Sequence, residues 1–281
     1  MRMHTIELPF AYRFEEVITR LALDPLNTVD INKQLVKIPL EDSIVTIHSV
    51  GSFLEPKFQL SGIMSNEQIQ RISSIFHFDR SLESVNDHFS KTNLKNLFSK
   101  FEGTPIITDY SLYANLIKSI IHQQLNLSFA RTLTTRFVQT FGEKVDDVWF
   151  YPTAEKIAEI DVETLRSMQF SSRKAEYIIG VSKAIACGEL NLEALSHETD
   201  KNIIKKLTTY RGIGPWTAES FLLFGLGRNN LFPVADVGLQ NSLKQLWKLE
   251  KKPTKEEIEI HFEAWSPFLS YAALYLWRNI E

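Results

Sequence analysis

Residues Leu207 to Leu243 read LTTYRGIGPWTAESFLLFGLGRNNLFPVADVGLQNSL, and this stretch has the pattern of a hairpin between two helices. The segment Asp200–Leu207 leads into it. This segment predicts a short helix, because apolar Ile203, Ile204 and Leu207 recur on one face. The predicted hairpin therefore lies between this helix and a second one that starts near Pro215.

Glycine and proline define the turn itself. Gly212 and Gly214 lack Cβ, so they allow positive φ and let another backbone approach closely. Pro215 suits the first turn of a helix, where a missing N–H costs nothing. The helix about Pro215 to Leu226 is nearly all apolar, so we expect it to be buried, with its N-terminal amides pointing at an anion. By itself, such a glycine pattern favours a simple tight turn between helices over a functional motif.

One carboxylate follows the turn at a short distance. Asp236 comes directly after the apolar run Phe232-Pro233-Val234-Ala235 and takes the expected N-cap position of the next helix. Taken alone, an aspartate before a helix is most often a simple N-cap. Its combination with the glycine hairpin favours a functional carboxylate.

The hairpin and Asp236 together resemble the helix-hairpin-helix DNA glycosylases, in which a short proline-containing loop after the hairpin ends in the catalytic aspartate. The resemblance is greatest to the 3-methyladenine DNA glycosylase II branch. It covers residues 105–281 well and the first hundred residues more weakly. It implies a hydrolase that flips alkylated purines out of duplex DNA and excises them, leaving an abasic site for base excision repair.

The composition of the chain is compatible with a DNA glycosylase but does not require one. The 281 residues suffice for two domains, and 44% hydrophobic with 23% charged residues is ordinary for a globular protein. The net charge of −3 gives no global signal for nucleic acid, so DNA binding must depend on a local patch. Basic residues around the hairpin could form one: Lys205, Lys206, Arg211, Arg228, Lys244, Lys248, Lys251 and Lys252. We expect Lys251 and Lys252, as well as Arg173 and Lys174 further upstream, to be solvated.

Cys187 is the only cysteine, so an internal disulfide is impossible and a reducing compartment is expected. It also excludes the four-cysteine iron–sulfur cluster that some relatives carry. We expect Cys187 to be a small buried residue. The first residues, MRMHTIELPFAYRFEE, contain no signal peptide or membrane span. The expected location is the cytoplasm, on the nucleoid when bound to DNA.

Two domains are predicted, with a boundary near Thr104-Pro105. Residues 1–103 alternate short β-rich runs with two or three helical patterns, which predicts an α+β domain with a small antiparallel sheet. Residues 104–281 are predicted to form an all-α helix-hairpin-helix domain. Within it, Asp146 to Ala158 is expected to be a short helix.

The predicted helix that contains Ile120 and Ile121 ends in Gln123, Gln124 and Leu125. This segment resembles the family's loop that enters the duplex, and glutamine amides bond well to base edges. The alternative is that Gln123 only caps or crosslinks the helix end. The side chain that fills the gap left by an extruded base would be Gln124 or Leu125.

The resemblance assigns the chemistry. A base must leave the stack to be reached, and a buried carboxylate stabilises the positive sugar that forms when its bond breaks; Asp236 takes that role. Lyase relatives place a nucleophilic lysine where this chain has Trp216, which implies a monofunctional enzyme. Trp216 and Trp277 become walls of the base pocket, although core packing is nearly as good an interpretation of Trp277. A pocket tyrosine of the family is replaced by Ser220.

The hairpin is expected to bind DNA through Arg211, Gly212, Gly214 and Thr217, mainly by backbone N–H groups on phosphates. The family also implies a structural monovalent cation, held here by the carbonyls of Tyr210 and Ile213. No cofactor is expected, and no cluster of transition-metal ligands is present in the sequence. The partner is double-stranded DNA with damaged bases, and a monomer is expected.

Three other functions remain open from the sequence. The chain could be a helix-hairpin-helix protein that binds DNA without catalysis, but a pure binder has no need of Asp236. It could be a glycosylase of the same fold for another damaged purine. A bifunctional lyase is disfavoured by Trp216.

Overall fold

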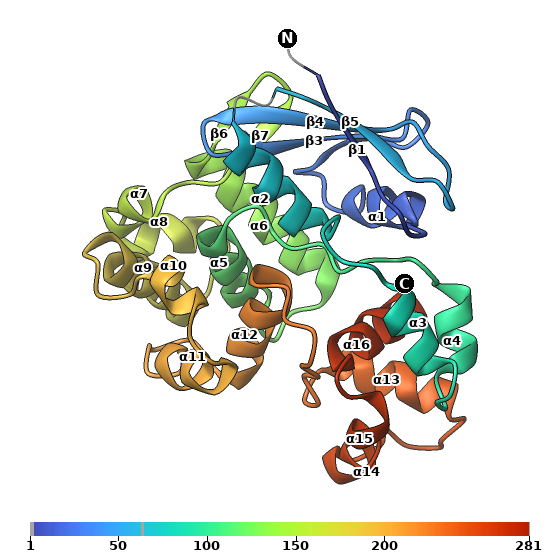
Figure 1. Cartoon of the computed structure of the whole chain (residues 1–281). Coiled ribbons are helices and arrows are strands. Elements are labelled where there is room, and N and C mark those ends of the chain that lie inside the picture. Colours follow the sequence, from blue (N-terminus) through green and yellow to red (C-terminus); the bar gives the residue numbers. More distant parts are fainter. Residues whose placement is uncertain (1–2, 63–64, 281) are drawn as a thin grey trace.

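The computed structural model describes residues 3–62 and 65–280. A five-stranded sheet lies beside two groups of helices, which occupy opposite sides of the view in Figure 1. The N-terminal elements are β1 (His4–Glu7), α1 (Phe14–Leu21), β2 (Thr28–Asp30), β3 (Leu35–Leu40), β4 (Ser43–Ser49), β5 (Lys57–Ser61), α2 (Asn66–Phe76), α3 (Glu83–Phe89) and α4 (Lys95–Lys100).

The elements that follow are mostly helical. They are α5 (Leu112–His122), α6 (Leu127–Phe141), β6 (Glu143–Val145), β7 (Val148–Phe150), α7 (Ala154–Ala158), α8 (Val162–Ser167), α9 (Ser172–Ala186), α10 (Leu192–Ser196), α11 (Asp200–Leu207), α12 (Pro215–Ser220), a π-helical turn η1 (Phe221–Gly225), α13 (Val237–Leu246), α14 (Lys255–Glu259), α15 (Phe262–Trp265) and α16 (Leu269–Arg278).

The N-terminal sheet confirms the α+β prediction. Its strands are antiparallel in the order β1-β5-β4-β3-β2. Alternate residues of the central strands, such as Val36 with Ile38 and Val45 with Ile47, are fully buried, because successive side chains of a strand point to opposite faces. Helices α1 and α2 contribute to the same core.

The helical part has two cores. One is built mainly from α5, α6, α9 and the α11–α12 region. The other joins α13–α16 to residues 82–101, which include α3 and α4. Since α3 and α4 precede Thr104 but share a core with the C-terminal helices, the domain boundary near that residue stays a prediction. Buried Arg278 of α16 also pairs with Glu16 of α1, which attaches the last helix to the N-terminal region.

Two local predictions were wrong. The helix predicted for Asp146 to Ala158 forms only at its end, as α7, because residues 143–150 make the hairpin β6–β7. Asp146 takes a positive φ of 51° in the turn of this hairpin, and Val148, Trp149 and Phe150 favour a strand. Cys187 is exposed, since it follows α9 on the chain's surface. Among the described residues, none of the helices has both the length and the apolar character needed to cross a bilayer.

Two histidines make the fold sensitive to acid. Burial and nearby Arg80 lower the pKa of His77 to about 3, and burial together with Lys118 does the same to His122. Between pH 6.5 and about 3 the unfolded chain therefore binds more protons than the folded chain. We expect the contribution of these two histidines to the free energy of unfolding to be highest above pH 6.5. Below it, each histidine should lower that energy by up to about 1.4 kcal/mol per pH unit.

Chemical denaturation at several pH values measures this slope. His77→Asn is the informative variant, because asparagine tolerates the left-handed backbone that His77 adopts (φ 53°). The slope between pH 6.5 and 4.5 should become shallower in this variant. An unchanged slope would contradict the assignment to His77.

Candidate functional site

Asp236 caps α13 and also binds two indole rings. Its Oδ1 accepts hydrogen bonds from the Leu239 backbone N–H (2.9 Å) and from Trp277 Nε1 (2.9 Å), and its Oδ2 accepts one from Trp216 Nε1 (3.1 Å). The predicted N-cap is thus confirmed, but it is not the whole role of the side chain. Three N–H donors hold the half-buried carboxylate in one orientation.

Three helix ends position the trio of Trp216, Asp236 and Trp277. Trp216 is in the first turn of α12, Asp236 immediately precedes α13, and Trp277 is in the last turn of α16. Gly238 lets Trp277 approach, because a Cβ there would lie 3.0 Å from Asp236 Oδ1 and 3.3 Å from Trp277 Nε1. No pattern in the sequence indicates this role of Gly238, since its neighbour Trp277 is 39 positions away.

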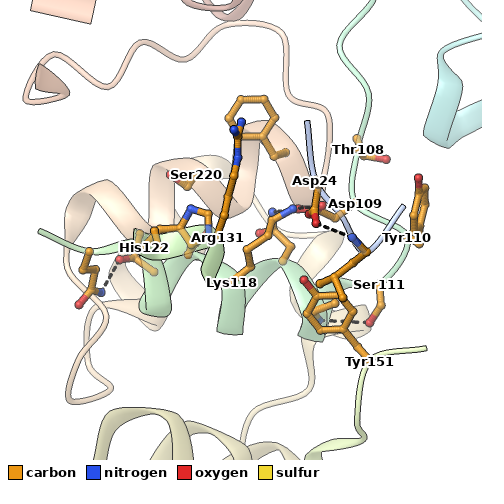
Figure 2. A pocket seen from close by; sticks show the side chains of 18 of the residues that line it. Asp24, Thr108, Asp109, Tyr110, Ser111, Lys118, His122, Arg131, Tyr151 and Ser220 are labelled. Atoms are coloured by element: carbon orange, nitrogen blue, oxygen red, sulfur yellow. Dashed lines mark hydrogen bonds and ion pairs between the residues drawn. The ribbon is translucent and has the colours of Figure 1, made fainter. Parts of the chain in front are cut away.

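The trio lies in a cleft of about 1870 Å³, between the N-terminal region and the helices. Phe224 adds an aromatic wall that sequence reasoning missed: its ring lies 5.6 Å from that of Trp277, and the Arg20 guanidinium lies 5.5 Å from its centroid. Phe224 belongs to η1, and π-helical turns often occur at functional sites. Ser220, 8% exposed, also lines the cleft (Figure 2).

Several polar side chains line another part of the cleft (Figure 2). Asp109 accepts a bond from Asn115 Nδ2 (2.6 Å) and pairs with Lys118. His122 Nε2 lies 3.1 Å from Thr134 Oγ1. Because that hydroxyl donates to the Ala130 carbonyl, it accepts from His122, which leaves the imidazole Nδ1 as an acceptor. No motif in the sequence indicates a function for these residues.

The hairpin has the predicted shape, with one difference between its glycines. Gly212 has φ 96°, and a Cβ on it would lie 2.2 Å from Cγ of Tyr177 in α9. Gly214 has an ordinary φ of −93°, and a Cβ on it would meet nothing within 4 Å. Only Gly212 therefore needs the conformational freedom of glycine. Arg211 is largely exposed beside it and pairs with Glu176 at 3.0 Å.

The loop after α5 meets this hairpin. Gln123 Nε2 donates to the Gly212 carbonyl (2.7 Å) and to Oγ1 of buried Thr217 (2.7 Å), so its side chain crosslinks two elements. Gln124 is exposed with φ 54°, whereas Leu125 packs against the helical core. Of the two candidates for an inserting side chain, Gln124 has the more accessible position.

Two basic residues are placed differently from the sequence expectation. Arg228 binds Asp200 (3.1 Å) and the carbonyl of Ser196 (2.8 Å), so it fixes the end of η1 to α10 and α11 and is not part of a free patch. Lys174 of α9 was expected to be solvated, but its side chain is half-buried against the end of α5. Lys205 and Lys206 are exposed on α11.

The predicted cation ligands lie in the hairpin turn. The Ile213 N–H donates to the Tyr210 carbonyl at 3.0 Å and closes the turn. A carbonyl has a second lone pair, so this bond is compatible with a cation there, which stays a prediction. No group of three or more His, Cys, Asp or Glu side chains suited to a metal occurs in residues 3–62 and 65–280.

Comparison with known proteins gives a consistent result. Residues 117–267 match the model of the HhH-GPD superfamily of base excision DNA repair proteins. A putative DNA-3-methyladenine glycosylase of Bacillus subtilis is 50% identical over 276 residues, which is 96% of either chain. The structure of a 3-methyladenine DNA-glycosylase from Archaeoglobus fulgidus has a TM-score of 0.84 at 25% identity, covering 98% of this chain and 97% of that one.

A third similar protein was solved with its nucleic acid. The 3-methyladenine DNA glycosylase Mag1 of Schizosaccharomyces pombe, in complex with abasic DNA, has a TM-score of 0.62 at 29% identity. The similarity covers 69% of this chain and 95% of that one. The aligned portion of the present chain therefore has the fold of a protein known to bind DNA.

Proposed function

The chain belongs to the HhH-GPD superfamily of base excision DNA repair proteins, and from this we propose that it is a monofunctional DNA N-glycosylase that releases alkylated purines, of the 3-methyladenine type, from duplex DNA. One observation carries the proposal: Asp236 is held by the indole N–H groups of Trp216 and Trp277 at an open cleft. This places a fixed negative charge between aromatic surfaces.

The chemistry follows from that arrangement. As the bond between base and sugar breaks, positive charge develops on the sugar, and the Asp236 carboxylate stabilises it. The same carboxylate can orient and deprotonate the attacking water. Water adds to the sugar carbon, the base leaves with the bonding electron pair, and an abasic site remains.

The lysines that line the cleft, in the part of the chain that the structure describes, are all engaged, which supports hydrolysis without strand cleavage. Trp216 occupies the position of the lyase lysine and offers no nucleophile. Three lysines line the cleft in the described residues: Lys37 is paired with Asp147, Lys118 is paired with Asp109, and the Lys174 amine donates to three backbone carbonyls. An ammonium engaged in this way has no lone pair to attack the sugar.

The aromatic lining favours alkylated purines. Trp216, Trp277 and Phe224 line the cleft near Asp236, and aromatic faces attract a cation such as a methylated purine. The substrate is proposed to be duplex DNA, with the chain acting as a monomer in the cytoplasm, on the nucleoid. The cation at Tyr210 and Ile213 is proposed to be structural, and no iron–sulfur cluster is proposed.

Product analysis tests the function. Wild-type protein should release free methylated purine from an alkylated duplex and leave an abasic site that nicks only after alkali treatment. Borohydride should trap no covalent enzyme–DNA adduct. Nicking without alkali, together with a trapped adduct, would contradict the monofunctional mechanism.

The two hairpin glycines should respond differently to alanine. Gly212→Ala places Cβ against Tyr177 at a positive φ, so the free energy of unfolding should fall by more than about 2 kcal/mol. Gly214→Ala should change it by less than about 1 kcal/mol but weaken binding to damaged and undamaged duplex alike, because its Cβ fills open space at the hairpin surface. Denaturation and fluorescence anisotropy measure the two effects. Equal stability of both variants would contradict this assignment.

A further inference from the structure

Lys174 connects the start of α9 to the end of α5. Its Nζ donates to the carbonyls of Ile120 (2.9 Å), Ile121 (2.8 Å) and Gln123 (3.0 Å). The last carbonyls of a helix have no partner within the helix and carry the negative end of its dipole. A single ammonium therefore donates to two of the last carbonyls of α5 and to the carbonyl of its C-cap residue Gln123, and it complements the dipole of the helix.

Partial burial destabilises the charged form of the Lys174 amine. The half-buried position lowers the pKa of the Lys174 amine to about 8, because a charge is less stable away from water. Solvent could satisfy the carbonyls of an exposed helix end without such a cost. The amine is kept where it is by three hydrogen bonds at 2.8–3.0 Å.

The same segment of α9 also supports the hairpin. Tyr177, one turn after Lys174, packs against Gly212, and Glu176 pairs with Arg211. Gln123 completes the connection, since its carbonyl accepts from Lys174 and its side chain donates to the Gly212 carbonyl and to Thr217. The exposed Gln124 follows directly on this doubly held residue.

We propose that Lys174 is a positioning residue that fixes the loop bearing Gln124 relative to the hairpin, so that the loop can hold a damaged nucleotide outside the duplex. The proposal rests on the proposed glycosylase function. Lys174 acts through Gln123 and the end of α5 and does not itself touch the base. Its loss should therefore impair extrusion of the nucleotide more than cleavage of its bond to the base.

Single-turnover base release by Lys174→Met, compared on two duplexes, tests this. One carries the lesion in a normal pair, and the other carries it in a single-nucleotide bulge, where it is already unpaired. We expect the rate to fall about 10- to 100-fold on the paired lesion and by less than about 3-fold on the bulged one. Lys174→Arg, which keeps the charge, should recover most of the rate.

Lys183→Met is the matched control, because Lys183 is exposed on the same helix; it should behave as wild type. Equal losses on the two duplexes, or no loss on either, would overturn the proposal. If Lys174→Met fails to fold, Gln123→Leu carries the same comparison, since it cuts the tie to the hairpin. If wild-type protein releases no base from either duplex, the glycosylase function itself fails.

Discussion

Asp236→Asn is expected to reduce base release by about 10³-fold or more. Asparagine keeps the shape of the side chain and is as good an N-cap as aspartate, so α13 should remain intact. What is lost is the negative charge that stabilises the sugar and the basic oxygen that takes a proton from water. Single-turnover release of a defined methylated purine from an oligonucleotide duplex measures the loss.

Two controls belong to this experiment. The melting temperature should change by only a few degrees, and the dissociation constant for a duplex with an abasic-site analogue should stay within about threefold of wild type, which is less than 1 kcal/mol. A release rate within tenfold of wild type would show that Asp236 is not the catalytic carboxylate. A large loss of binding would show that its role is mainly structural.

The second large effect is expected at the two indoles. Trp216→Phe and Trp277→Phe each keep an aromatic ring in the cleft but remove one N–H donor to Asp236. Hydrogen bonds to charged groups are worth about 1.5–3 kcal/mol, so each variant should release base about 10- to 100-fold more slowly. Because both indoles hold one carboxylate, the double variant should lose less than the product of the two single losses.

Rates of the two single variants and the double variant, measured together, test this coupling. Leu231→Met, a conservative change of a partly buried core residue outside the cleft lining, serves as a stability-matched control. If each phenylalanine variant releases base at the wild-type rate, the indole N–H groups do not orient the carboxylate. If the rate loss of the double variant equals the product of the two single losses, the two rings act independently.

The sequence predicted the parts of the site that depend on local pattern. Gly212 takes positive φ, Pro215 begins α12, and Asp236 caps α13, because each of these features depends on residues within one helical turn. The resemblance to a known family added Trp216 and Trp277 as walls of the pocket that contains Asp236, but it did not predict their hydrogen bonds to the carboxylate. Their contact joins residues 20 and 41 positions from Asp236, which periodicity alone does not predict.

At the site, the features that the sequence missed depend on contacts that are distant in sequence. Lys174 was expected to be solvated because it begins a helix, but its partners lie more than 50 positions earlier in the chain. Gln123 uses its amide to hold the hairpin, the alternative that the sequence left open. Phe224 reaches the cleft from a π-helical turn, and the apolar run that contains it is equally consistent with a regular buried helix.

The most direct test of the central claim is the release of free methylated purine from alkylated duplex DNA by wild type and Asp236→Asn side by side, with the released bases identified by chromatography. Release by the wild type alone is the predicted result, and it would establish both the glycosylase activity and the catalytic carboxylate. Equal release by both proteins would contradict the site described here. Tight DNA binding without release by either would contradict the proposed substrate.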